Sequence, residues 1–185
     1  EMEILGETID DAAGEAFDKA GKILNLPYPA GPIIDKKSKI GDPTKFKFAK
    51  PKIEGLNFSF SGFKTSILYF IQKEVKANPN FIEENIDDLC ASIQYSIVNI
   101  LMEKVKKASD ETGIKQIAIA GGVSANSEIR QRLKDGETEF GWKTFIPKFA
   151  YTTDNAAMIA MVGSLKFDQE LFTKNTAKSV AKYHI

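Results

Sequence analysis

Apolar residues recur at helical spacing in three long segments of the chain, at about residues 9–24, 64–77 and 82–112. Apolar positions three and four residues apart fall on one face of a helix, so each segment predicts an amphipathic helix. The longest segment is followed by Gly113, a natural C-cap because glycine adopts the left-handed conformation freely. Its apolar stripe consists of Leu89, Ile93, Ile97, Ile100, Leu101 and Val105.

Several short segments have the apolar patterns of strands. Residues 115–120 form a near-continuous apolar run, which is typical of a strand buried on both faces. Residues 56–60 alternate as a half-buried strand, and residues 2–6, 46–48 and 142–147 predict further short strands. Because strands alternate with helices, the sequence predicts an α/β or α+β architecture with a small, mostly parallel sheet.

Proline and lysine interrupt the chain after the first predicted helix. Residues 27–32 contain three prolines and end that helix, since proline lacks the amide donor and restricts the residue before it. Residues 35–54 are rich in lysine and are broken by glycine and proline, which predicts loops around the short strand at 46–48. We expect residues 1–167 to form one domain and residues 168–185 to form a polar surface helix or tail.

The composition is that of a globular protein, with 43% hydrophobic and 27% charged residues. Lys+Arg and Asp+Glu both number 25, so the net charge gives no general argument for a nucleic-acid partner. Arg130 and Arg132 are the only arginines, which leaves few side chains for bidentate contacts to phosphates or bases. The single cysteine, Cys90, excludes an internal disulfide. Because the sequence shows no leader and no membrane-length apolar run, we expect a cytoplasmic protein.

The first candidate site is an acidic helix face. Asp11, Glu15 and Asp18 follow one another at i, i+4 and i+7, and Thr8-x-x-Asp11 has the spacing of a capping box. These carboxylates indicate either a solvated face favoured by the helix dipole or a group that accepts hydrogen bonds from ligand hydroxyls, such as those of a ribose.

Two strand-to-helix turns are the next candidates. Residues 57–65 bring hydroxyls and a glycine to a helix start, where free N–H groups meet a polar ligand or Ser61 acts as N-cap. Residues 120–126 place two glycines after a strand, either for a ligand to approach the backbone or for helix–strand packing. Asn126 offers a donor and an acceptor to an adenine edge or a ribose hydroxyl. The sequence contains neither G-x-G-x-x-G nor a Walker A motif.

The fourth candidate is Asp154, within Tyr-Thr-Thr-Asp-Asn-Ala-Ala-Met-Ile-Ala at residues 151–160. A carboxylate at this predicted helix start is either a cap or a hard oxygen ligand that completes a metal site with imidazoles. His184 is the only histidine, and Cys90 has the apolar neighbours of a core residue. By itself the chain therefore supports neither a histidine-rich metal site nor a Ser/His/Asp or Cys/His hydrolase.

In this order, the four segments resemble the tRNA adenosine threonylcarbamoyltransferases, the TsaD family, from Ile4 to Ala160. The resemblance implies an α/β, actin/sugar-kinase-like (ribonuclease-H-like) fold with two lobes around a nucleotide cleft. It implies transfer of threonylcarbamoyl from threonylcarbamoyl-adenylate to the exocyclic amine of the adenosine beside the tRNA anticodon. The implied partners are tRNA, a paralogous dimerisation subunit and an ATPase subunit of the modification complex, with no membrane.

The resemblance also assigns roles to five residues. It implies that Asp18 contacts the substrate, that Gly31 contacts it through the backbone, and that Asp35 is a further ligand-contacting position. It implies that Asn126 contacts the nucleotide and that Asp154 is a ligand of one divalent metal, iron or zinc. Such a metal would orient and polarise the carbamoyl carbonyl.

The sequence lacks the family's two metal-binding histidines, spaced H-x-x-x-H, and its Ser-Gly-Gly loop. We therefore expect the C-terminal portion of a longer protein, an incomplete lobe that folds at least partly, binds metal and adenylate poorly and is inactive alone. The alternative is a non-catalytic nucleotide-binding scaffold paralogue of the same fold. Asp154 with Asn155 favours the enzyme, because a scaffold needs no carboxylate at that helix start.

Sugar kinases, actin-like ATPases and metalloproteases are further alternatives. The Phe-Ser-Phe-Ser-Gly run at residues 58–62 and the segment around Asp154 disfavour the first two classes, and the absence of H-E-x-x-H disfavours the third. The lysines from Lys36 to Lys52 are either candidates for salt-sensitive contacts to the tRNA backbone or ordinary solvated loop residues.

Overall fold

The computed structural model describes residues 3–153, 155–174, 176 and 178. They belong to two compact units, Glu1–Thr152 and Thr153–Ile185, and each unit is described by itself. Within the described residues, no helix is both long and apolar enough to cross a membrane. The predicted domain boundary between residues 167 and 168 stays a prediction.

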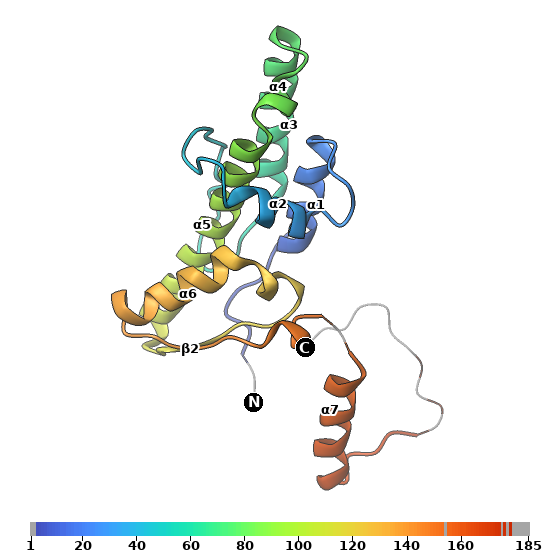
Figure 1. Ribbon diagram of the computed structural model, residues 1–185. Coiled ribbons are helices and arrows are strands. Elements are labelled where there is room, and N and C mark those ends of the chain that lie inside the picture. Colours follow the sequence, from blue (N-terminus) through green and yellow to red (C-terminus); the bar gives the residue numbers. More distant parts are fainter. Residues whose placement is uncertain (1–2, 154, 175, 177, 179–185) are drawn as a thin grey trace. The chain divides into compact units, whose positions relative to one another are not determined.

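The first unit contains six α-helices, two strands and two 3₁₀ turns among its described residues (Figure 1). In chain order these elements are α1 (Ala13–Ile23), α2 (Gly31–Ser38), α3 (Ser61–Ala77), α4 (Phe81–Glu84), α5 (Ile86–Thr112), β1 (Gln116–Ala118), η1 (Gly122–Ala125), α6 (Ser127–Glu139), β2 (Lys143–Phe145) and η2 (Phe149–Tyr151). The mixed α/β architecture with a small parallel sheet confirms the coarse prediction from the sequence.

The main hydrophobic core lies where α1, α2 and α3 meet α5. The stripe predicted for α5 is buried at Leu89, Ile93 and Ile97, each with none of its surface exposed, and at Ile100. Full burial of an aliphatic side chain contributes about 1.5–3 kcal/mol, so this stripe is a large part of the stability of the unit. Gly113 ends α5 in the left-handed conformation, with φ of 71°, as predicted.

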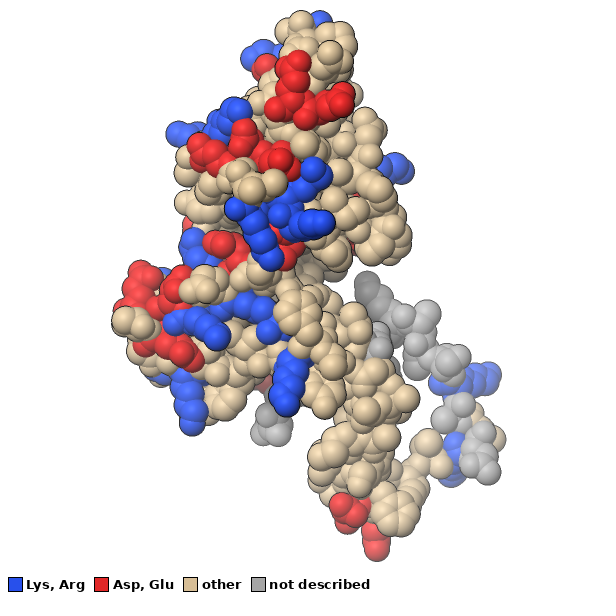
Figure 2. Space-filling model, in the orientation of Figure 1, with Lys and Arg blue, Asp and Glu red and all other residues tan. Residues whose placement is uncertain are grey.

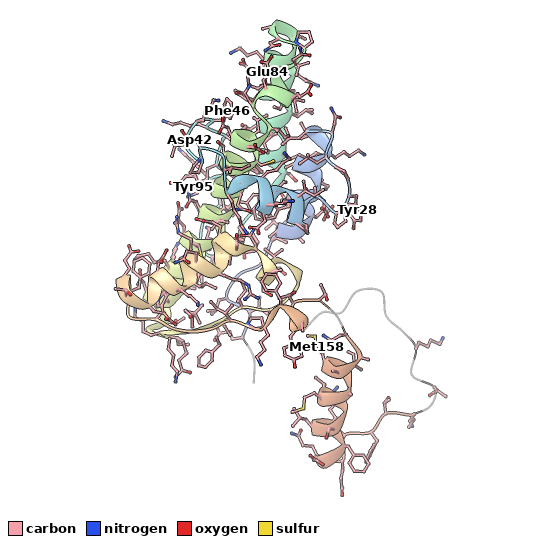
Figure 3. The ribbon with its side chains drawn as sticks, viewed as in Figure 1. Tyr28, Asp42, Phe46, Glu84, Tyr95 and Met158 are labelled. Atoms are coloured by element: carbon pink, nitrogen blue, oxygen red, sulfur yellow. The ribbon has the colours of Figure 1, made fainter. Side chains whose placement is uncertain are left out.

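The lysine-rich segment after α2 is irregular but well packed. Phe46 and Phe48 form no strand, contrary to the prediction, and their rings lie 5.4 and 5.7 Å from the ring of Phe70. Ser92 on α5 holds the segment, because its hydroxyl donates to the carbonyl of Asp42 and accepts from the N–H of Phe46. Asp42 and Phe46 are labelled in Figure 3. The aromatic side chains therefore fix this loop to the helices without a strand partner.

A second apolar cluster joins α5 to the parallel strands β1 and β2, where Ile117 lies opposite Thr144. Ile117 and Ile119 pack against α5 and α6 in this cluster, whereas Gln116 and Ala118 are exposed. The prediction that this run is buried on both faces is therefore wrong for the described residues. The strands alternate instead, since the helices cover only one face of the two-stranded sheet.

Four other local predictions differ from the structure. Neither residues 3–7 nor residues 56–60 form a strand, and Thr8 and Phe58 make only an isolated parallel bridge. Met2 lies outside the described residues. Helix α1 begins at Ala13 with no side-chain cap, so the capping box at Thr8 is wrong. Helix α2 was not predicted, because prolines interrupt the sequence before it. Pro32 lies in the first turn of α2, where a helix N–H has no intrahelical partner and its absence does not destabilise the helix.

The second unit contains α7 (Ala156–Asp168), the helix predicted after the segment around Asp154. The side chain of Asn155 caps it by accepting a hydrogen bond from the N–H of Met158 at 3.1 Å. Asp154 and His184 lie outside the described residues. The structural cap of this helix is thus Asn155.

We expect Gly136→Ala to lower the free energy of unfolding by about 1–3 kcal/mol. A Cβ atom on Gly136 of α6 would lie 2.4 Å from the Trp142 ring, which is 4% exposed and donates to Ser109. Gly62→Ala is the matched control, because a Cβ on this helical glycine would meet only Pro51 at an ordinary 3.7 Å. Urea unfolding that ranks Gly62→Ala as the more damaging change would contradict the packing of α6 on Trp142.

Candidate functional site

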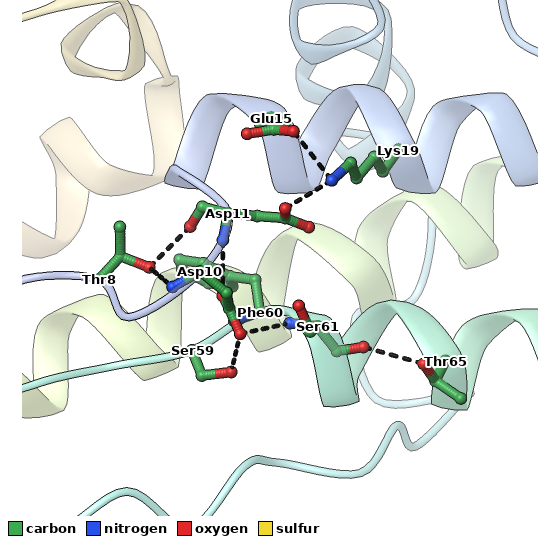
Figure 4. Close-up of polar contacts among 9 residues, drawn as sticks. All are labelled: Thr8, Asp10, Asp11, Glu15, Lys19, Ser59, Phe60, Ser61 and Thr65. Atoms are coloured by element: carbon green, nitrogen blue, oxygen red, sulfur yellow. Dashed lines mark hydrogen bonds and ion pairs between the residues drawn. The ribbon is translucent and has the colours of Figure 1, made fainter. Parts of the chain in front are cut away.

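Asp10 is the centre of a polar network that joins the chain before α1 to the start of α3 (Figure 4). Its carboxylate accepts hydrogen bonds from the N–H of Phe60 at 2.8 Å, from the hydroxyl of Ser59 and from the N–H of Ser61 at 3.3 Å. Desolvation of the carboxylate opposes ionisation, but these hydrogen bonds together hold the pKa of Asp10 well below its usual range. The group is therefore charged at neutral pH.

Asp10, rather than Ser61, satisfies the first N–H groups of α3. The N-cap position is Phe60, which has no side-chain cap, so the alternative in which Ser61 acts as N-cap is wrong. The side chain of Asn57 reinforces the same junction by accepting from the N–H of Glu7 at 2.9 Å. A polar ligand at this helix start would therefore compete with the Asp10 carboxylate for the N–H groups of Phe60 and Ser61.

The acidic face of α1 divides into two parts. Lys19 lies 2.5 Å from a carboxylate oxygen of Asp11 and 2.8 Å from one of Glu15, so these two acids form an ion-pair network. Asp18 lies apart from it and accepts a hydrogen bond from the N–H of Ala30 at 2.8 Å. Of the three acids, only Asp18 is directed to the loop that precedes α2.

Two glycines of α1 face neighbouring segments, but only Gly21 is required for a close approach. A Cβ on Gly21 would lie 2.1 Å from the Cβ of Ala30, so only glycine fits under this loop. A Cβ on Gly14 would lie 3.4 Å from a methyl group of Val123 in η1. Gly14, Asp18 and Gly21 are spaced i, i+4 and i+7, so the carboxylate lies between the α2 loop and the η1 turn.

Asp35 connects α2 to the start of α6. Its carboxylate accepts from the N–H of Ser127 at 3.0 Å and from the hydroxyl of the same residue at 2.7 Å. Gly31 lies one turn before Asp35, on the same face of α2. The prediction that Asp35 lies in a loop is wrong, and its helical position fixes the direction of its side chain.

Asn126 is 9% exposed and caps α6. Its carbonyl oxygen accepts from the N–H of Ile129 at 3.1 Å, and its amide donates to the side chain of Gln94 at 2.7 Å. The two hydrogen bonds use one of the two acceptor lone pairs and one of the two N–H donors of the side-chain amide. One acceptor and one donor therefore remain.

Four residues predicted from the sequence are thus brought into one continuous line. Asp18 contacts the residue before Gly31, Gly31 and Asp35 share a face of α2, and Asp35 contacts the residue after Asn126. Asp154 is the fifth predicted residue and lies outside the described part of the chain. Among the described residues there is no group of three or more His, Cys, Asp or Glu side chains that could hold a metal.

The two glycines before Asn126 face open space. Gly121 has φ of 80°, a conformation that favours glycine, whereas Gly122 has an ordinary φ. In the described structure no atom lies within 4 Å of a Cβ built on either residue. Helix–strand packing therefore does not explain Gly122. Beside it, the hydroxyl of Ser124 is buried and has no hydrogen-bond partner within the described structure.

Two hollows of the first unit lie elsewhere. They are formed by the loop segment from Pro43 to Glu54 together with α5, and none of the four predicted residues lines them. Cys90 is fully buried, and desolvation raises the pKa of its thiol to about 12. It is a core residue, as the sequence indicates, and not an activated nucleophile.

These features define a mixed α/β protein with a polar line across α1, α2 and the start of α6. A sequence model of the family described as tRNA N6-adenosine threonylcarbamoyltransferase, TsaD, matches residues 1–161. The chain therefore belongs to this family.

Three relatives, all named tRNA N6-adenosine threonylcarbamoyltransferase, show the extent of the similarity. The proteins of Riemerella anatipestifer and Christiangramia forsetii are both 62% identical, over 100% and 98% of this chain and 54% of each relative. That of Thermotoga neapolitana is 44% identical over 92% of this chain and 51% of the relative. The chain thus spans about half the length of the curated relatives it matches. Which half it corresponds to stays a prediction.

We expect Asp10→Ala to destabilise the protein by about 0.5–2 kcal/mol, the range for loss of a side chain that caps a helix N-terminus. Because the folded-state pKa of Asp10 is lowered, its contribution is complete above an unfolded-state pKa of about 4. It is lost as the pH falls through the folded-state pKa. Urea unfolding at pH 7 and pH 3 measures both effects. Asp135→Ala on α6 is the control, and an Asp10→Ala effect that grows on acidification would contradict the assignment.

Proposed function

We propose that the full-length protein transfers a threonylcarbamoyl group from threonylcarbamoyl-adenylate to the exocyclic amine of the adenosine beside the tRNA anticodon. In this reaction the amine nitrogen bonds to the carbamoyl carbon, the bond from that carbon to the phosphate oxygen of AMP breaks, and the amine loses a proton. Family membership over residues 1–161 and the names of the relatives support the proposal.

The observation that carries the proposal is the open backbone at Gly121 and Gly122, at the end of the line from Asp18 to Asn126. We propose that the adenylate lies along this line. Asp18 has one carboxylate oxygen to accept from a ribose hydroxyl, since its other oxygen holds Ala30. The remaining donor and acceptor of Asn126 suit a nucleotide, and Gly31 allows close approach to the start of α2.

A metal is part of the proposal. We propose that Asp154 is one ligand of a single iron or zinc ion and that histidines in the rest of the protein supply others. Among the described residues, no group of three or more His, Cys, Asp or Glu side chains could hold a metal. When bound, the metal would polarise the carbamoyl carbonyl and stabilise the charge that develops there.

The finer fold and the partners are proposals of the same kind. We infer that the described α/β unit is an incomplete lobe of an actin/sugar-kinase-like (ribonuclease-H-like) fold in a cytoplasmic protein. A paralogous dimerisation subunit and an ATPase subunit are the proposed protein partners, on the basis of the resemblance stated above.

Asp18→Asn in the full-length protein tests the adenylate site. Asparagine keeps the oxygen that holds Ala30 but removes the charge, so we expect transfer to tRNA to fall about tenfold or more, a loss of at least about 1.4 kcal/mol of transition-state stabilisation. The thermal unfolding temperature should stay close to that of the parent. Incorporation of labelled threonine into tRNA by the complete set of subunits measures the activity.

Glu15→Gln is the matched control, because it makes the same chemical change one turn away, in the ion pair with Lys19. Its activity should stay within about twofold of the parent. Equal loss in both variants would point to a general effect of charge on α1.

We also expect the 185-residue chain alone to transfer no threonylcarbamoyl, and activity without the rest of the protein would contradict the shared metal site.

A further inference from the structure

The segment from β2 to η2 carries three exposed aromatic side chains and two lysines without an intervening acid. Phe145, Phe149 and Tyr151 are 48%, 65% and 52% exposed. Lys143 and Lys148 alternate with them, and residues 143–153 contain no Asp or Glu. Exposed rings of this size cost free energy in water. Their alternation with lysines indicates a binding surface whose ligand contacts both the rings and the positive charges.

Arg130 makes a fixed platform under this segment. Its guanidinium donates to the carbonyl of Ser124 at 2.6 Å and to that of Pro147 at 2.8 Å, and its centre lies 4.6 Å from the centroid of the Phe149 ring. The turn itself is held by the hydroxyl of Thr152, which donates to the carbonyl of Phe149 at 2.8 Å. Phe149 is therefore presented on a rigid support, with more than half of its surface open.

Strand β2 separates the lysine and the ring from the nearest acid on α6. Glu137 accepts from the N–H and the hydroxyl of Thr144, whose side chain lies on the helix-facing side of the strand. Lys143 and Phe145 point to the opposite, exposed face, because side chains alternate along a strand. Across the sheet from Phe145 lies the small side chain of Ala118, and the ammonium group of Lys143 lies over the Phe145 ring, 5.5 Å from its centroid.

The charge of this surface differs from that of the rest of the first unit. Over α2 to α5, lysines and acids are interspersed (Figure 2). Several lysines there form ion pairs with carboxylates, for example Lys37 with Asp87, Lys45 with Asp88 and Lys106 with Asp110. The ion pairs found among the described residues include neither Lys143 nor Lys148. Their charge is therefore available to an anionic partner.

We propose that Phe145, Phe149 and Tyr151, with Lys143 and Lys148, bind unpaired nucleotides of RNA. The rings stack on bases and the lysines contact phosphates, the combination by which proteins hold single-stranded nucleic acid. The inference rests on the proposed function. Under that function, the RNA that binds here is the tRNA loop that carries the adenosine to be modified. Arg130 ties this surface to η1, so the bound loop lies beside the open Gly121–Gly122 backbone.

The test uses the full-length protein and a fluorescein-labelled RNA hairpin with the sequence of an unmodified anticodon stem and loop. Phe149→Leu keeps an apolar side chain but removes the stacking ring, and we expect it to weaken binding about tenfold by fluorescence anisotropy. Phe149→Trp should bind within about twofold of the parent. Lys148→Gln should lower the slope of log K against log salt by about one. Lys134→Gln, at an exposed position of α6, is the control and should leave both quantities unchanged.

Thermal unfolding and threonylcarbamoyl transfer of the same proteins separate the outcomes. Equal RNA affinity of parent, Phe149→Leu and Lys148→Gln would overturn the inference, and normal transfer by the parent would then leave the proposed function intact. A large fall in unfolding temperature for Phe149→Leu, with RNA affinity of its folded fraction unchanged, would also overturn it and assign the surface to packing against the rest of the protein. Weaker RNA binding by Phe149→Leu and Lys148→Gln, with no transfer by the parent, would support the surface and contradict the function. Neither binding nor transfer by the parent would contradict both.

Discussion

Burial of α5 is the constraint on which the rest of the first unit depends. The helix is 27 residues long and contributes to both hydrophobic clusters. Leu89, Ile93 and Ile97 face the helices α1 to α3, whereas Val98 and Met102 face α6 and the sheet. Because two different faces of one rigid helix are covered, the helical layer and the sheet are held in a fixed relation through α5.

The polar line depends on the same helix. Gln94 of α5 is 4% exposed and accepts from the amide of Asn126, which fixes the start of α6. Helix α2 lies along α5, and Ile34 has none of its surface exposed; this holds Asp35 where it meets Ser127. The residues proposed to contact a nucleotide are therefore positioned by buried side chains of α5 and α2.

Local patterns predicted the parts of this arrangement whose causes lie within a few residues. The stripe of α5 and the glycine after it both act within one helix or its end. Asp10 could not be found in this way, since the helix that it caps starts 51 residues later in the chain, at Ser61. The open face of β1 was mispredicted for a related reason: an apolar run shows that a strand can be buried, but the packing elements decide whether it is.

The predicted ligand residues have structural roles, and the proposed nucleotide contacts would use the donors and acceptors that remain. Asp18 uses one carboxylate oxygen to hold Ala30, and Asn126 uses one donor and one acceptor within the fold. These bonds restrict the side-chain rotamers before any ligand binds. A nucleotide that engaged the remaining lone pairs and N–H groups would therefore lose little side-chain entropy on binding. The proposed site would use the donors and acceptors of these side chains that the fold leaves free. It would be pre-organised, because the other donors and acceptors of the same side chains are already bonded within the fold.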